Sequence, residues 1–102
     1  MNETGAYPMT VVADIGTLIA RDAGLCGGRP RIAGTGVSVR RIVGWYKLGC
    51  SPEEVVERIG HLSLAQVHAA LAFYHANREA MESEIAAEEA EADRFKDAVR
   101  KG

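Results

Sequence analysis

The stretch Cys26–Val39, Cys-Gly-Gly-Arg-Pro-Arg-Ile-Ala-Gly-Thr-Gly-Val-Ser-Val, separates two parts of the chain that differ in character. Before it lie short apolar runs, Met9–Ala13 and Thr17–Ala20, whose β-branched residues are typical of strands. Within it, we expect Arg31–Ala33 to pair with Leu18–Ala20 as a two-stranded ribbon. Because such a ribbon is marginal in water, either another chain or helices of its own must complete it.

The glycines of this stretch invite comparison with loops that bind phosphate. No Gly-Lys-Ser/Thr sequence follows them, and their spacing is not that of a dinucleotide-binding fingerprint. A role in turns and in the ribbon is therefore favoured over nucleotide binding. The glycines concerned are Gly27, Gly28, Gly34 and Gly36.

After this stretch the apolar residues follow helical spacing. Val39, Ile42, Val43 and Tyr46 lie at i, i+3, i+4 and i+7, which predicts a helix from Ser38 that stops at Gly49. Ser51-Pro52-Glu53-Glu54 predicts the start of a second helix, ending at Gly60, and Ser63 with Gln66 predicts the start of a third. Three helices with tight connections are typical of a helix-turn-helix unit.

The fold class predicted is mainly α: a trihelical helix-turn-helix core with a short N-terminal β-ribbon and a long C-terminal helix. We divide the chain into a flexible arm at 1–17, a ribbon and trihelical domain at 18–77, and an acidic helical extension at 78–102. No glycine or proline occurs from His61 to Lys101. The sequence therefore allows either one long helix or two helices with a break near Asn77.

An apolar stripe at alternating spacings of three and four follows the last part of the chain. It is interrupted by Arg78 and Glu88, and its second half extends past anything this chain could wrap around it. We expect Met81, Ile85 and Phe95 to bind a partner. The surrounding acids have two open interpretations: a solubilising or coiled-coil arm of a dimer, or a strap that lies in a groove of a basic protein.

Composition excludes several function classes. The net charge is −2, yet six basic residues and one acid lie between Arg21 and Gly49, while eight acids and four bases lie between Glu79 and Gly102. This asymmetry indicates two partners, one of them anionic. Two cysteines and three histidines spaced by seven fit no metal site, and no catalytic motif or cofactor site is visible. We expect a cytoplasmic, non-enzymatic protein without a secretory signal or membrane span.

The basic residues are candidates for nucleic-acid contact. Arg40 and Arg41 open the first helix, Arg29 and Arg31 precede it, and arginine forks bind phosphate well. In a helix-turn-helix, Gln66 and His68 would lie near the N-terminal end of the third helix, where glutamine can pair with adenine. The competing interpretation is that these arginines are ordinary solvated surface.

The sequence resembles the domain-of-unknown-function 433 family from about Leu18 to Tyr74. The resemblance lies in Cys26–Thr35 with Val37, in Ser51–Val55, and in Leu62–Tyr74, and its Cys-Gly-Gly-x-Pro-x-Ile-x-Gly-Thr string is specific. It departs at Gly36, where the family usually has Arg or Lys, and at Ser38, where Pro is common. The resemblance implies a homeodomain-like helix-turn-helix and a role like that of VapB-type antitoxins, often encoded beside a PIN-like toxin nuclease.

We therefore predict an antitoxin-like protein of a toxin-antitoxin pair. The C-terminal helix would neutralise a PIN-like toxin nuclease, and a homodimer, with the ribbon helping two subunits meet, would bind operator DNA. The alternative is a protein-interaction module that keeps the helix-turn-helix fold and does not bind DNA.

Overall fold

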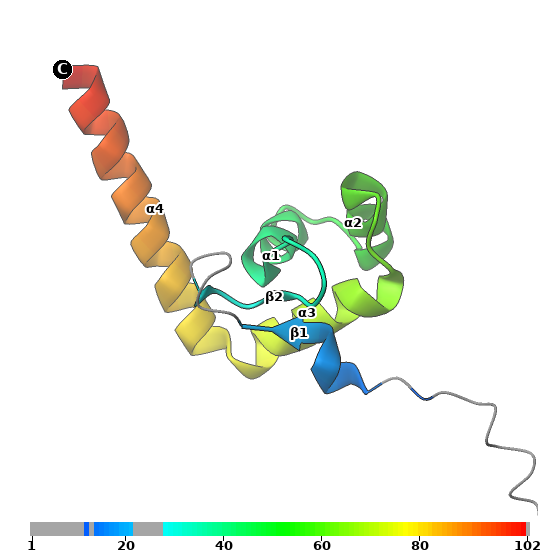
Figure 1. Ribbon diagram of the computed structural model, residues 1–102. Coiled ribbons are helices and arrows are strands. Elements are labelled where there is room, and N and C mark those ends of the chain that lie inside the picture. The colour runs from blue at the N-terminus through cyan, green and yellow to red at the C-terminus, as the bar shows by residue number, and fades with distance from the viewer. Residues whose placement is uncertain (1–11, 13, 22–27, 102) are drawn as a thin grey trace, which may run out of the picture.

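The computed structural model describes residues 12, 14–21 and 28–101, with the side chains of the last two excepted. Its elements are a 3-10 helix (Ile15–Leu18), strands β1 (Ile19–Ala20) and β2 (Arg31–Ile32), and helices α1 (Val39–Lys47), α2 (Pro52–Ile59), α3 (Leu64–Ala76) and α4 (Arg78–Lys101). The ribbon and α1–α3 form a body from which α4 projects, giving principal extents of 74 × 29 × 24 Å (Figure 1). The fold is mainly helical with a small antiparallel sheet, as the sequence predicts.

Local hydrogen bonds at their ends explain where the helices begin and stop. The Ser51 hydroxyl accepts from the Glu54 N–H at 3.2 Å, and the Glu54 carboxylate accepts from the Ser51 N–H at 2.7 Å. Ser63 and Gln66 repeat this capping box at the start of α3. Just beyond α1, Gly49 has a φ of 98°, a conformation that favours glycine. The predicted starts and stops are confirmed.

The ribbon is completed by helices of its own chain. β1 and β2 pair antiparallel with Ile19 opposite Ile32, and Ile32 is fully buried in the helical core. After β2, Gly34 adopts a φ of 79°, and the Ile32 N–H donates to the Val37 carbonyl at 2.9 Å as the chain turns back. The predicted ribbon is confirmed, and Ile32, with the partly buried Ile19, packs it against the chain's own helices.

The strand predicted at Thr17–Ala20 is wrong in its first half. The Asp14 carboxylate accepts a hydrogen bond from the Gly16 N–H at 3.0 Å, and the Asp14 backbone carbonyl accepts one from the Thr17 N–H at 3.0 Å. These short-range bonds favour the 3-10 helix over an extended chain. Most of the arm predicted at 1–17 and the strand at 9–13 apart from Val12 lie outside the described residues, as does Gly27.

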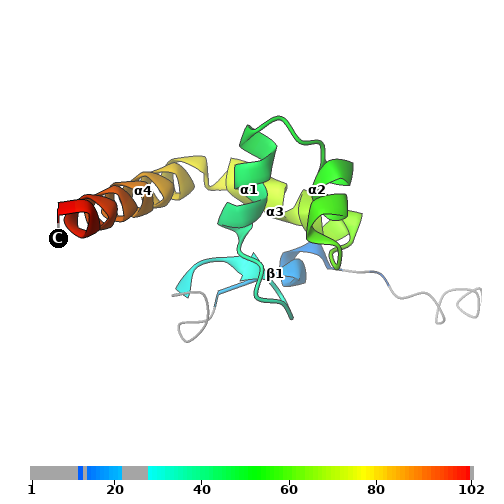
Figure 2. The same ribbon diagram turned by 90° about the horizontal axis from the view of Figure 1, so that it is seen from above.

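The core runs through the ribbon and α1–α3 into the first turns of α4. Asn77, with φ −126° and ψ 36°, ends α3, so the two C-terminal helices are separate. The views in Figures 1 and 2 agree that α4 leaves the body at an angle to α3. Met81 and Ile85 are only 4% and 8% exposed. The packed core thus extends past the boundary expected at residue 77.

Candidate functional site

The arginines expected to bind nucleic acid gather around a carboxylate of the same chain. Glu88 of α4 pairs with Arg40, Nε to Oε1 at 2.7 Å, and also with Arg29. The Glu88 side chain is 23% exposed, whereas those of Arg40 and Arg29 are 41% and 46% exposed, so this contact is only partly buried. Arg29 and Arg40 therefore lie together as an anion-binding pair, and any phosphate approaching them competes with Glu88.

The other two predicted arginines have different surroundings. The Arg31 guanidinium donates to the Thr35 carbonyl at 3.3 Å and thereby supports the turn that follows β2. Arg41 is exposed in the first turn of α1 and forms no ion pair within the described part of the chain. Arg41 is therefore available to a partner, whereas Arg31 stabilises its own loop.

A second carboxylate, Glu82, joins α4 to α1 and α3. Lys47 Nζ lies 2.7 Å from Glu82 Oε1, and the Tyr74 hydroxyl donates to the other oxygen. The hydrogen bond from Lys47, and then that from Tyr74, lowers the pKa of Glu82. The hydrogen bond with Glu82 raises the pKa of Lys47, and together with burial it raises the pKa of Tyr74. This cluster fastens α4 to the body.

The N-terminal part of α3 is less open to DNA than the sequence predicts. The Gln66 side-chain oxygen accepts from the Ser63 N–H at 2.7 Å, so half of the amide that would pair with adenine is already bonded. His68 is exposed and lines a cavity of about 340 Å³. The cavity is otherwise apolar, lined by Ile15, Leu18, Ala65, Ala69 and Ala72. The 3-10 helix thus lies beside the face of α3 that was expected to contact DNA bases.

The predicted partner-binding residues divide into two groups. Met81 and Ile85 are buried in the chain's own core because the first half of α4 folds against the body, so their expected contact with a partner is corrected. Phe95 and Val99 are 69% and 62% exposed. Four residues apart, these two lie on one face of the projecting half of α4. That half is called the distal segment below, residues 91–101.

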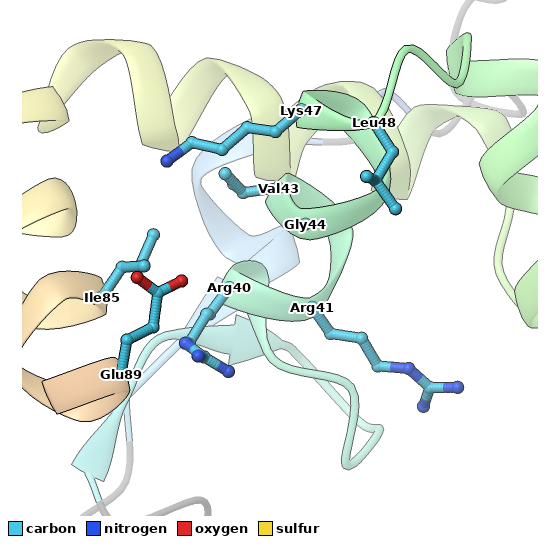
Figure 3. A pocket seen from close by; sticks show the side chains of 8 residues that line it. All are labelled: Arg40, Arg41, Val43, Gly44, Lys47, Leu48, Ile85 and Glu89. Carbon is cyan, nitrogen blue, oxygen red and sulfur yellow. The ribbon is translucent and has the colours of Figure 1, made fainter. Parts of the chain in front are cut away.

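A groove of about 370 Å³ lies between α1 and α4 (Figure 3). Its lining consists of Arg40, Arg41, Val43, Gly44, Lys47, Leu48, Ile85 and Glu89. Sequence reasoning missed this groove because its two walls are about 40 residues apart in the chain. The sequence did hold one signal for the ion pairs beside the groove. Glu88 interrupts the apolar stripe, and a charge in a core-facing stripe indicates a partner of opposite charge.

No site for a metal ion is found among the described residues, where no three His, Cys, Asp or Glu side chains come together. The helices in the described ranges are also too short or too polar to cross a membrane.

The geometry defines a trihelical helix-turn-helix body with a projecting C-terminal helix. The family model described as "Protein of unknown function (DUF433)" matches residues 19–74, and the chain belongs to this family. A crystal structure of a DUF433 member protein from Anabaena variabilis ATCC 29413 shares the fold, with a TM-score of 0.64 and 23% identity. The match covers 84% of this chain and 99% of that one. A search of curated proteins finds no match.

Proposed function

We propose that this chain is a cytoplasmic, non-enzymatic, antitoxin-like protein that holds a PIN-like toxin nuclease through the distal segment. The supporting observation is the exposure of Phe95 and Val99 on a helix that leaves its own body. Large apolar side chains that share one face of a solvent-exposed helix are typical of helix-in-groove recognition.

Magnitudes favour these two side chains as anchors. Burying a phenylalanine or valine side chain is worth about 1.5–3 kcal/mol each, whereas an exposed charge pair contributes about 0–1 kcal/mol. The acids near the anchors, Glu91 and Asp93, then match the cations that a nuclease presents to phosphate. Affinity would come from Phe95 and Val99, and selectivity from the acids.

Capture of the protein encoded by the neighbouring gene tests the proposal. We expect Phe95→Asp in the full chain to lose the partner in a co-purification, with affinity reduced about 100-fold or more. Ala90→Asp is the matched control because residue 90 is exposed and lies about 140° around the helix from Phe95. Equal capture by both variants would remove the distal segment from the proposal.

Operator binding by a dimer is the second part of the proposal. The turn between α2 and α3 has the helix-turn-helix arrangement that favours it. Against it stand Glu88, which occupies Arg29 and Arg40, and the engaged Gln66 side chain. The alternative, an interaction module that does not bind DNA, predicts no binding of upstream DNA at low salt. Operator contact predicts binding that weakens steeply as salt rises.

A further inference from the structure

The groove between α1 and α4 combines open space at an exposed glycine with an exposed apolar side chain. Val43 and Ile85 are buried at its base, and a Cβ atom placed on Gly44 would meet nothing within 4 Å. Leu48 lines the same groove and is 77% exposed. One surface thus presents both a space for a side chain and a side chain that needs covering.

Charges of opposite sign line the two walls of the groove: basic residues on α1 and an acidic residue on α4. Arg41 comes from α1 and Glu89 from α4, both are exposed, and neither forms an ion pair with any described residue. Figure 3 shows the Arg41 side chain directed away from Glu89, on the far side of the opening. Arg40 and Lys47, by contrast, are taken by Glu88 and Glu82.

We propose that this groove is where two copies of the chain meet about a two-fold axis. In a two-fold contact the same patch appears on both subunits, so each must supply both halves of every interaction. Arg41 of one copy then faces the partner's Glu89, and Leu48 packs over the partner's Gly44. Arg41 and Leu48, which are exposed in the single chain, thus find complements in the same patch of the second copy.

Other occupants fit the groove less well. A nucleic-acid strand would meet the Glu89 carboxylate and would find Arg40 and Lys47 already paired. A small apolar ligand would leave Arg41 without a partner and Glu89 with only the attraction of Lys47, whose pKa it helps to raise. The β-ribbon, which was the earlier candidate for subunit contact, offers less apolar surface, because Ile32 is buried in the helical core and Ile19 packs partly against it. A dimer is already required by the operator-binding part of the proposed function, and the groove gives that dimer a contact surface. This surface uses neither Phe95 nor Val99, so it is independent of toxin capture.

Charge reversal in the full-length chain tests the proposal through its mass in sedimentation or light scattering. We expect a dimer for the unchanged protein. Arg41→Glu and Glu89→Arg should each raise the dimer dissociation constant roughly tenfold or more, since each places like charges together twice across the axis. The double variant should restore the dimer, because both pairs are re-formed with opposite signs.

A second set of variants tests the open space at Gly44. Gly44→Gln should prevent the dimer by filling the space with a long side chain, while Gly44→Ala, which adds one methyl group, should keep it. Circular dichroism verifies the fold of each variant. A monomer for the unchanged protein up to about 100 µM, where even weak specific dimers form, would overturn the proposal. A dimer that is insensitive to charge reversal, or a double variant that stays monomeric, would also overturn it. Toxin capture is a separate readout, so either idea can fail alone.

Discussion

Three carboxylates of α4 bind cations from separate parts of the chain. Glu84 lies 3.5 Å from Arg21, Glu88 joins Arg29 and Arg40, and Glu82 joins Lys47. An exposed ion pair is worth about 0–1 kcal/mol. Most of the stabilisation that these carboxylates give α4 is therefore expected from the partly buried Glu88 contact and from the hydrogen-bonded Glu82 cluster. At the scale of single residues, the predicted basic surface is real, but α4 already neutralises much of it.

The pH dependence of the free energy of unfolding should reveal the contribution of the Glu82 carboxylate. Hydrogen bonds lower its pKa below the ordinary 4.5, so its ionised form contributes stability above pH 4.5, and this contribution is lost as pH falls through the folded pKa. We expect the difference in unfolding free energy between the native chain and Glu82→Gln to shrink from about pH 7 to about pH 3, measured by urea denaturation.

The matched control for this experiment is Glu91→Gln, because Glu91 is exposed and forms no ion pair within the described ranges. Its unfolding free energy should follow that of the native protein at every pH. A Glu82→Gln difference that stays constant with pH would show that the carboxylate is not stabilised by Lys47 and Tyr74.

At the scale of elements, the helices could be predicted where the determining signals are local. Pro52–Ile59 follows from Ser51, Pro52 and Glu54, which act within one turn. The break at Asn77 stayed open because no glycine or proline marks it. The contact between Arg40 and Glu88 could not be predicted, since it depends on how α4 folds back to meet a residue 48 positions earlier in the chain. The 3-10 helix was missed because a single residue, Asp14, overrides the strand preference of its neighbours.

Two glycines of the first helical segment should respond to alanine with opposite signs. Gly44 is an exposed interior residue of α1 with open space around its Cβ position, so Gly44→Ala should stabilise the protein by up to about 1 kcal/mol. Gly49 has a φ of 98°, so Gly49→Ala should destabilise it by about 1–2 kcal/mol. Thermal and urea unfolding of both variants measures this, and changes of the same sign would contradict the assigned helix end.

At the scale of the whole molecule, the two halves of α4 have different roles. Its first half completes the core through Met81 and Ile85, and its distal segment extends into solvent. The sequence predicted the projection correctly but placed its start too early. An apolar stripe does not reveal which of its members meet their own chain, since that depends on the angle at Asn77.

Truncation separates these two halves. A chain ending at Asn77 loses the burial of Met81 and Ile85, about 1.5–3 kcal/mol each, which is a large part of the 5–15 kcal/mol that stabilises an ordinary domain. We expect it to be unfolded or nearly so. A chain ending at Ala90 keeps both side chains and Glu88, so its melting temperature should fall by only a few degrees while partner capture is lost. Equal melting temperatures for the two truncated chains would contradict this division.

The division of α4 has a consequence for how such a protein can diversify. Because Phe95 and Val99 are exposed and lie beyond the core, substitutions in the distal segment leave the folding free energy of the body nearly unchanged. Residues 19–74, which match the family, do not depend on the distal segment for their packing. A duplicated copy could thus acquire a new partner by drift in that segment alone, without passing through unstable intermediates.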